Sequence, residues 1–468
     1  MHLQGKKILV LGLGDTGLSM TRWLVRQDAV VSVADTRAVP PGVRQLADEL
    51  PQVRVRTGPF QHEDFARADL IAVSPGIDPR TGELAAALRR GMPVAGDIEF
   101  FAQALRERND TGKNPSRARV IAITGSNGKS TVTQMCGDIC ASAGLVTEVA
   151  GNIGQPVLDV MCDIEDGRRM PDAFVLELSS FQLETTASLE PDAATLLNLS
   201  EDHMDRYDSF SDYGAAKARI FAGMEKEACV QVLNRDDGFS LSTRRDGLRL
   251  ATFGLSAPLS ADEWGLTGVR ETLTLAHGDN SLMRMSELPL AGLHNAANAL
   301  AAGALCAAIG IGHESISRAL RAFKGLPHRV EKINKINEIE FYDDSKGTNV
   351  GATVAALSGM QQPVVLIAGG DGKGQNFSPL AVAAQRARAV VLIGRDAVLI
   401  AQALEHADVT LLRAGDMVEA VEVAYRAAKP GDAVLLSPAC ASYDMFRSYV
   451  HRAAVFAEAV TQLARRAG

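Results

Sequence analysis

A short glycine loop at residues 120–131, VIAITGSNGKST, does most to limit the folds that this chain can adopt. An apolar run comes before the loop, and after it apolar residues recur at helical spacing from Val132 to Cys140. A strand, a glycine loop and a helix in this order form a phosphate-binding unit, because backbone N–H groups and a lysine can hold phosphates there. The motif predicts a parallel α/β domain with its ligands at the carboxyl ends of the strands.

The loop is shorter than the usual P-loop, which has four residues between its first glycine and the Gly-Lys pair. Here Gly125 and Gly128 enclose only Ser126 and Asn127. A plain glycine-rich turn is the alternative, and the GKST tetrad that ends at Thr131 disfavours it. We expect the lysine of the tetrad to hold phosphates and one of its hydroxyls to meet Mg²⁺.

A second glycine loop, GLGDTG at residues 12–17, lies near the N-terminus. It follows an apolar strand at residues 6–11 and precedes a helical segment, and the next strand ends at Asp35. This order is typical of a dinucleotide-binding fingerprint, in which the acid meets a ribose or base. Taken alone, the fingerprint favours NAD.

Length and charge limit the class of protein. A chain of 468 residues exceeds one hydrophobic core, so we expect two or three domains, and 46% apolar with 22% charged residues is ordinary for a globular protein. A net charge of −8 disfavours nucleic acid as a partner. The six cysteines are scattered, no leader precedes the first strand, and the most apolar stretch, residues 296–312, is too short for a bilayer. We therefore expect a cytoplasmic protein with no membrane insertion.

Acids and a histidine follow two further strands of the middle segment. The strand at residues 174–176 leads into Glu177, and the strand at residues 195–199 leads towards His203. Because the carboxyl ends of parallel strands share one edge of a sheet, both side chains are candidates for a metal-phosphate site. Each taken singly is also consistent with a helix cap or a surface group.

A third set of strands, at residues 339–342, 364–368, 389–393 and 433–436, is followed by polar or glycine-rich loops. Together with a polar linker expected at residues 106–119, these patterns predict three α/β domains. We place the predicted domains at residues 1–110, 111–325 and 326–468.

Eight motifs in order along the chain resemble the Mur ligase family: ITGSNGKST, ELSSFQLE, EDHMDRY, HNAAN, HRVE, DDSKGTN, GGDGKG and SPACASYDMF. The shortened glycine loop is that family's own form of the P-loop. The resemblance implies an N-terminal Rossmann-like UDP-binding domain, a central P-loop ATPase-like domain and a C-terminal Rossmann-like domain. It also changes the meaning of the first glycine loop, from NAD binding to the UDP of a nucleotide sugar.

Within the family, the motifs are most similar to the members that add D-glutamate. The resemblance then implies a monomeric ligase of peptidoglycan precursor synthesis with ATP, UDP-N-acetylmuramoyl-L-alanine and D-glutamate as its ligands. ATP would convert a carboxylate of the UDP-sugar into an acyl phosphate, which the amine of D-glutamate attacks. Cations must offset the repulsion between the two anions of the first step.

The resemblance also assigns residues to three ligands. The ATP site would comprise Gly125, Ser126, Asn127, Gly128, Lys129, Ser130, Thr131, Asn295, Asn298, Arg329 and Asp344. The UDP-sugar site would comprise Gly14, Asp15, Thr16, Asp35, Thr36, Arg37, Ser74, Gly76 and Asn152. The D-glutamate site would comprise Thr348, Lys373, Ser442 and Tyr449.

The catalytic set implied by the resemblance is Lys129, Glu177, His203, Lys217 and Lys346. Two Mg²⁺ ions are expected, with Ser130, Glu177, His203 and Lys217 as the metal ligands. Lys217 would act as a carbamate, because an ammonium repels Mg²⁺ whereas a carbamate offers a hard anionic oxygen. From the residues alone, a surface lysine is the alternative.

Two departures from the family pattern lie near the C-terminus: Tyr449 replaces an expected Phe, and HRAAVF at residues 451–456 replaces a more usual E-R-G-x-x-F. Two alternative functions also stay open. One is another ligase of the superfamily, of the alanine-adding or folylpolyglutamate type, which DDSKGTN and the UDP-type domain disfavour. The other is an NAD-binding regulatory protein, which only the first glycine loop supports.

Overall fold

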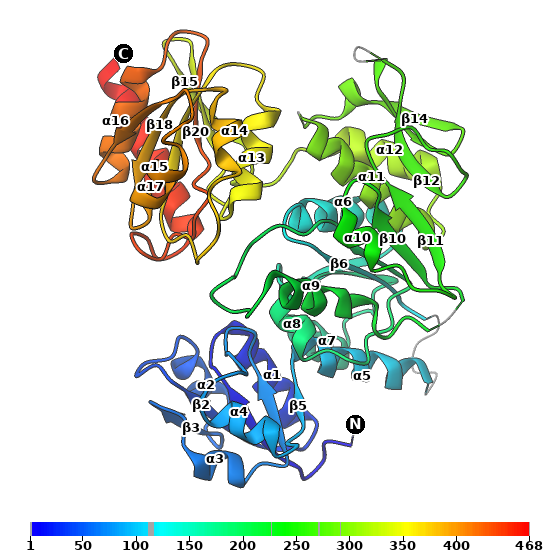
Figure 1. The fold of residues 1–468 in the computed structure, drawn as a ribbon. Helices are drawn as coiled ribbons and strands as arrows, with labels where there is room; N and C mark the ends of the chain where they lie inside the picture. The colour runs from blue at the N-terminus through cyan, green and yellow to red at the C-terminus, as the bar shows by residue number, and fades with distance from the viewer. Residues whose placement is uncertain (1, 111–116, 226, 270–271, 291, 468) are drawn as a thin grey trace.

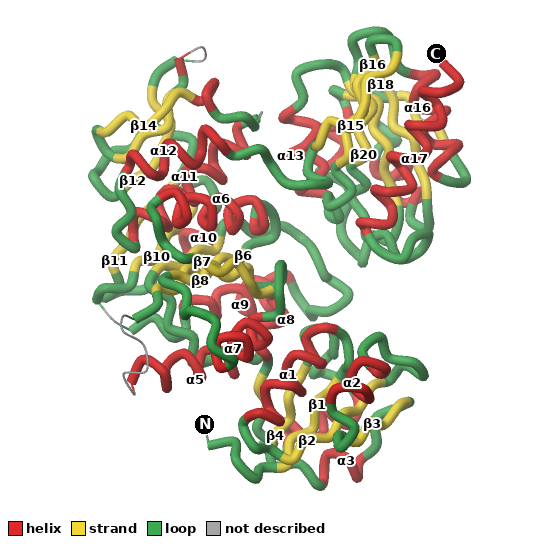
Figure 2. The backbone as a smooth tube through the Cα atoms, turned by 180° about the vertical axis from the view of Figure 1, so that it is seen from behind, coloured by secondary structure: helices red, strands yellow, loops and turns green. Residues whose placement is uncertain are grey.

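The computed structural model describes residues 2–110, 117–225, 227–269, 272–290 and 292–467. Three separate sheets divide it into an N-terminal, a central and a C-terminal unit (Figure 1). The helices lie on both faces of the sheets in the view from behind (Figure 2). The three α/β units agree with the fold class expected from the sequence. No helix among the described residues is long and apolar enough to span a bilayer.

The N-terminal unit is a fully parallel five-stranded sheet with the order β3-β2-β1-β4-β5. Its strands are β1 (Lys7–Leu11), β2 (Val30–Asp35), β3 (Arg54–Thr57), β4 (Leu70–Val73) and β5 (Val94–Ala95), and its helices are α1 (Asp15–Arg26), α2 (Val43–Glu49), α3 (His62–Ala66) and α4 (Gly82–Arg89). The strand order reverses beside β1, so the first glycine loop lies at the switch point where open α/β sheets bind ligands.

The central unit contains nine strands in the order β14-β13-β12-β11-β10-β9-β6-β8-β7. The strands are β6 (Arg119–Thr124), β7 (Thr147–Gly151), β8 (Ala173–Glu177), β9 (Ala193–Leu196), β10 (Val230–Asn234), β11 (Arg249–Phe253), β12 (Glu263–Thr267), β13 (Thr274–His277) and β14 (Asn280–Arg284). The helices are α5 (Asp97–Asp110), α6 (Lys129–Ser142), α7 (Val157–Glu165), α8 (Ser180–Glu184), α9 (Phe210–Ala218), α10 (Gly238–Ser242), α11 (Leu293–Ala308) and α12 (His313–Ala322). Only the β12-β13-β14 edge is antiparallel among the described pairs.

The C-terminal unit has six strands in the order β15-β16-β20-β17-β18-β19, of which only the β15-β16 pair is antiparallel among those described. The strands are β15 (Glu331–Ile336), β16 (Ile339–Asp343), β17 (Val364–Gly369), β18 (Ala387–Ile393), β19 (Thr410–Arg413) and β20 (Ala433–Leu436). The helices are α13 (Val350–Gly359), α14 (Leu380–Ala384), α15 (Ala397–Ala403), α16 (Met417–Ala427) and α17 (Tyr449–Ala467). The strands β17, β18 and β20 are almost continuous apolar runs because helices cover both faces of the sheet.

The expected linker at residues 106–119 is only partly correct. Residues 106–110 are the last turns of α5, β6 begins at Arg119, and residues 111–116 lie outside the described residues. The polar residues of this stretch are typical of a linker, but in α5 they form the outer face of a helix whose apolar face is buried, with Phe101 against Phe174 of β8 at 5.0 Å between ring centroids.

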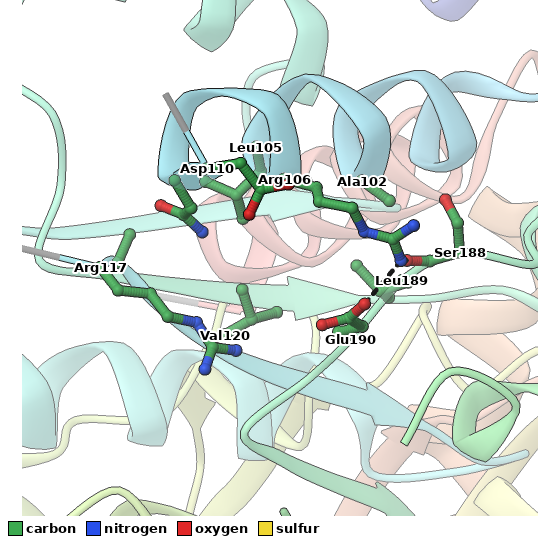
Figure 3. Close-up of a pocket in the computed structure, with 11 residues that line it drawn as sticks. Ala102, Leu105, Arg106, Asp110, Arg117, Val120, Ser188, Leu189 and Glu190 are labelled. Carbon is green, nitrogen blue, oxygen red and sulfur yellow. Dashed lines mark hydrogen bonds and ion pairs between the residues drawn. The ribbon is translucent and has the colours of Figure 1, made fainter. Parts of the chain in front are cut away.

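Helix α5 is fixed to the central unit by charged groups at both ends. The Glu99 carboxylate accepts the N–H groups of Ala187 (2.8 Å) and Ser188 (2.9 Å). At the other end Arg106 donates to Ser188 O (2.9 Å) and pairs with Glu190 (2.7 Å), beside a small cavity (Figure 3). The helix therefore packs as part of the central unit and carries the N-terminal unit at its first turn.

Candidate functional site

The central glycine loop has the conformation of a phosphate cradle. Gly125 (φ 150°) and Gly128 (φ 85°) both lie in the region that favours glycine, and a Cβ on Gly128 would lie 2.6 Å from Asn298 Oδ1. Lys129 starts α6 and folds back, so that its Nζ donates to Gly125 O (2.8 Å) and Ser126 O (3.0 Å). Burial lowers the pKa of Lys129. The loop is thus a P-loop with its lysine already held over the turn.

Two cations of the C-terminal unit reach the same loop. Arg329 Nη2 donates to Ser130 Oγ at 3.0 Å, and Lys346 Nζ donates to that oxygen at 3.1 Å. Burial, and next the charge of Arg329, lower the pKa of Lys346 to about 8. With Lys129, three basic side chains therefore contact the P-loop at the start of α6, where negative charge is favoured.

Glu177, at the end of β8, connects the P-loop to the N-terminal side of the site. Its Oε1 accepts a hydrogen bond from Asn152 Nδ2 at 2.9 Å. Its Oε2 is buried and accepts no hydrogen bond from any described residue. Burial tends to raise the pKa of this carboxyl, but the charge of Lys129, the nearby Ser130 hydroxyl and the amide of Asn152 hold it below its usual value. The carboxylate is ionised, with a free oxygen that suits a hard cation.

His203 lies in the loop after β9, which ends at Leu196, earlier than expected. The residue has a left-handed backbone (φ 57°), and its N–H donates to Asp202 Oδ1 at 3.0 Å. The ring packs edge-on against Phe181, at 4.8 Å between centroids. Burial lowers the pKa of His203 to about 4, so the imidazole is neutral and has a lone pair for a metal at neutral pH.

Lys217 is buried on α9, although the surface alternative was open from the sequence. Its side chain is only 2% exposed, its Nζ donates to Gly125 O at 2.9 Å, and it lies 4.7 Å from the centroid of the Tyr213 ring. Burial, and next the charge of Lys129, lower the pKa of Lys217 well below its usual value. The amine is therefore neutral more readily than a surface lysine.

The chemistry of Ser130, Glu177 and His203 fits Mg²⁺, but these residues do not form a compact ligand cage. Among the described residues, three ligand atoms within 4.8 Å of one another occur at His328, Glu331 and Asp343. Glu177 and His203 are not part of that group. An ion at the P-loop would therefore take many of its oxygen ligands from phosphates and water, as Mg²⁺ does in nucleotide sites.

A cavity beside the P-loop contains all four residues expected at the nucleoside. Asn295 and Asn298 come from α11, while Arg329 and Asp344 come from the C-terminal unit. Asp344 accepts a hydrogen bond from Ser437 Oγ at 2.6 Å. Burial raises the pKa of Asp344 to about 7. The central and C-terminal units both line the cavity, so a ligand in it would contact both units.

A larger cavity of about 600 Å³ lies between the N-terminal and central units. The residues predicted for the UDP-sugar all line it: Gly14, Asp15, Thr16, Asp35, Thr36, Arg37, Ser74, Gly76 and Asn152. The last glycine of the fingerprint, Gly17, is required there, because a Cβ would lie 1.8 Å from Gly12 O. The first glycine loop, the end of β4 and the turn after β7 therefore meet at one pocket.

Asp35 has a larger structural role in this cavity than the fingerprint predicts. Its carboxylate accepts the N–H of Leu13 (2.7 Å) and of Arg37 (2.8 Å) and pairs with the Arg37 guanidinium (2.5 Å). These bonds, against the effect of burial, lower the pKa of Asp35 to about 2. The acid thus fixes both the glycine loop and the cation that faces the cavity.

The residues predicted for D-glutamate are distributed over three loops of the C-terminal unit. Lys373, after β17, pairs with Asp202 of the central unit. Tyr449 begins α17, and its ring lies 5.5 Å from Lys346 Nζ. Thr348 is half-buried beside Lys346, and Ser442 is buried near the C-terminal end of β20. No contact among the four is described.

Two residues that the sequence analysis did not assign have defined places around the site. Asp202 bridges the central and C-terminal units through Lys373. Arg452, in the atypical stretch at residues 451–456, is fully buried and donates to Ser345 Oγ (3.0 Å), Ser345 O (2.8 Å) and Cys440 O (3.0 Å). Arg452 thus ties α17 to the loop of Lys346. The only sequence signal for this role of Arg452 is that an arginine lies on an otherwise apolar face of the helix.

The fold and the site define a three-unit α/β enzyme with a P-loop in its central unit and a separate Rossmann-like pocket in its first. The chain belongs to the Mur ligase family. Residues 6–96 match the model of the Mur ligase MurD-like N-terminal domain, residues 123–306 the Mur ligase middle domain, and residues 328–440 the Mur ligase glutamate ligase domain.

Similar proteins cover almost the whole chain. A UDP-N-acetylmuramoylalanine–D-glutamate ligase from Thiobacillus denitrificans is 55% identical over 99% of this chain and 98% of its own length. One from Nitrosomonas europaea is 52% identical over 100% of this chain and 98% of its own length. Among solved structures, a UDP-N-acetylmuramate-alanine ligase from Thermotoga maritima has a TM-score of 0.59 at 18% identity, covering 98% of this chain and all of that one, which shows the shared fold.

Proposed function

We propose that this chain is an ATP-dependent ligase that joins D-glutamate to UDP-N-acetylmuramoyl-L-alanine through an acyl phosphate, in the cytoplasmic synthesis of peptidoglycan precursors. The relatives more than 50% identical over their full length carry the name of this activity. The observation that carries the proposal is the hydrogen bond between Asn152 and Glu177. It links the wall of the UDP-type cavity to Glu177, whose charge interacts with Lys129 of the P-loop, so under this proposal a donor in that cavity would meet the phosphates.

The first chemical step joins two anions, the donor carboxylate and the terminal phosphate. Their repulsion is about 1 kcal/mol in water at 4 Å and several-fold larger in a protein interior. Lys129 and Lys346 offset it, since both ammonium groups lie within hydrogen-bond range of the P-loop. The acyl phosphate forms as the bond between the β- and γ-phosphates breaks, and Arg329 stabilises the charge on the nucleotide side.

Mg²⁺ supplies Lewis-acid stabilisation of the phosphate oxygens when it is bound. Ser130 and Glu177 would hold one ion, and His203 with carbamylated Lys217 would hold a second. Carbamate formation needs a neutral amine, which attacks CO₂ and loses a proton. The burial of Lys217, which lowers its pKa, supports this assignment.

The second step is attack by the neutral amine of D-glutamate on the acyl carbon, with phosphate as the leaving group. We assign recognition of the acceptor to Thr348, Lys373, Ser442 and Tyr449, since its carboxylates need cationic and hydroxyl donors. Asn295, Asn298 and Asp344 hold the nucleoside, and the lining of the larger cavity holds the UDP-sugar. We expect a monomer.

Phosphate release from ATP with UDP-N-acetylmuramoyl-L-alanine tests the proposal. Release should require D-glutamate, and L-glutamate and L-alanine should give only background rates. Preference for L-alanine would identify an alanine-adding ligase instead. Stabilisation by NAD without ATP hydrolysis would favour the regulatory alternative.

A further inference from the structure

Two of the three C-terminal loops that carry proposed acceptor residues contact one carboxylate of the central unit. Lys373 Nζ forms an ion pair with Asp202 Oδ1. Asn349, the residue after Thr348, directs its Nδ2 towards Asp202 Oδ2 at 3.4 Å. An ammonium and an amide from separate loops therefore form a small anion site, and a protein carboxylate occupies it.

The anion site is largely shielded from water, and its lysine is fixed by the backbone. The side chains of Lys373 and Asp202 are only 13% and 9% exposed. Lys373 has a left-handed backbone (φ 52°), and its N–H donates to Asp371 Oδ1 at 3.0 Å, which sets the direction of its side chain. A buried ammonium without a counter-charge is unfavourable, so Asp202 stabilises the closed position of these loops.

Under the proposed function Lys373 has a second partner, because its ammonium is expected to bind the side-chain carboxylate of D-glutamate. Two carboxylates at one buried ammonium repel each other, and the amide of Asn349 cannot compensate a second negative charge. Binding of the acceptor therefore requires that Asp202 leave Lys373.

We propose that Asp202 is an internal competitor for the acceptor: it occupies Lys373 before the acceptor binds, and D-glutamate binds by displacing it with its side-chain carboxylate. Asp202 then sets specificity, because an amino acid without a side-chain carboxylate cannot replace the charge that Lys373 loses. This inference rests on the proposed function and adds a specificity-determining residue to it.

A neighbouring contact provides a matched control. Glu201 Oε2 accepts the backbone N–H of Asn376 at 3.0 Å, so it also links the central and C-terminal units. Its described bond is to that N–H and not to Lys373. Removing its charge changes the same interface without changing the anion site.

The test is the affinity for D-glutamate, measured by calorimetry on enzyme loaded with ADP and UDP-N-acetylmuramoyl-L-alanine, so that no turnover is needed. Asp202→Asn, which keeps the shape and removes the charge, should bind D-glutamate about threefold or more tightly than the wild type. Asp202→Glu, which keeps the charge, should not gain affinity. In a Lys373→Ala background the gain from Asp202→Asn should disappear, because the shared partner is absent.

Glu201→Gln should leave the affinity for D-glutamate within about twofold of the wild type. Unchanged or weaker binding by folded Asp202→Asn, while the wild type binds and ligates D-glutamate, would refute the competition and leave the proposed function intact. A wild type that binds no D-glutamate would overturn both. Circular dichroism of each variant separates these results from misfolding.

Discussion

At the scale of single residues, the site is defined by where charge is buried. Lys217 and Asp344 are both nearly inaccessible to water, and burial shifts the pKa of each towards the neutral form. His203 is also neutral, with a pKa of about 4. A neutral amine and a neutral imidazole are the forms that react with CO₂ or bind a metal, so burial prepares these groups for the roles that we propose.

Lys217→Ala should abolish most ligase activity without unfolding the protein, because the carbamate ligand is lost. A short carboxylate such as acetate should restore part of the activity by occupying the vacated space. Lys217→Arg should show no rescue, since the guanidinium fills the space and stays charged. Phosphate release with and without acetate measures this, and near-normal turnover of Lys217→Ala would contradict the carbamate assignment.

Asp344→Asn should stabilise the protein increasingly as the pH rises. Burial raises the pKa of Asp344 from 3.8 to about 7. The folded state therefore binds more protons than the unfolded state between these values, so the wild type loses stability as the pH rises through that window. Asparagine does not titrate, so the variant does not lose this stability as the pH rises. Melting temperatures of the two proteins at pH 5 and pH 8 should diverge, and a constant difference would show that Asp344 does not titrate there.

At the scale of elements, helix α5 decides how the first two units are joined. Its Glu99 carboxylate accepts two backbone N–H groups and the Ser188 hydroxyl (2.7 Å). Burial raises the pKa of Glu99, but these bonds outweigh it and lower the pKa. The N-terminal family model ends at residue 96, just before α5 begins. The domain boundaries that we predict at residues 110 and 325 stay predictions. The first of them depends on the unit against which α5 packs, and sequence composition does not encode that packing.

Glu99→Ala should destabilise the attachment of α5 by roughly 2–3 kcal/mol, because two backbone donors at a part-buried site lose a charged acceptor. Hydrogen exchange should quicken in residues 97–110 and 187–188. Glu49→Ala is the control, since Glu49 pairs with Arg22 on the surface, where an ion pair contributes at most about 1 kcal/mol. Equal effects of the two substitutions would show that Glu99 does not hold α5 against the central unit.

At the scale of the whole molecule, three units share one site. The nucleoside cavity has walls from the central and C-terminal units, and the larger cavity has walls from the N-terminal and central units. Arg329 and Lys346 reach the P-loop from the C-terminal unit. Water would hydrolyse an acyl phosphate, so we expect the units to open to admit ligands and to close for the reaction.

Adding an ATP analogue and UDP-N-acetylmuramoyl-L-alanine together should lower the radius of gyration in small-angle scattering. Either ligand alone should give a smaller change, because each cavity joins only two of the units. A radius that is the same with and without ligands would contradict closure of this chain.

The sequence by itself determined the elements and the chemistry of their loops. Glycine loops after apolar strands predicted the P-loop and the Rossmann-like pocket, because only local backbone geometry is needed for them. The residues that the family resemblance assigns to the nucleoside and to the UDP-sugar each line one cavity, and their roles stay predictions.

Only the tertiary structure decided which charges meet. Lys217 has the pattern of a surface residue and is buried, Arg106 lies within a helix where a linker was expected, and Asp202 pairs with a lysine 171 positions along the chain. These facts depend on contacts between distant segments. The free energy of a buried charge is set by its neighbours in space, which residue spacing does not encode.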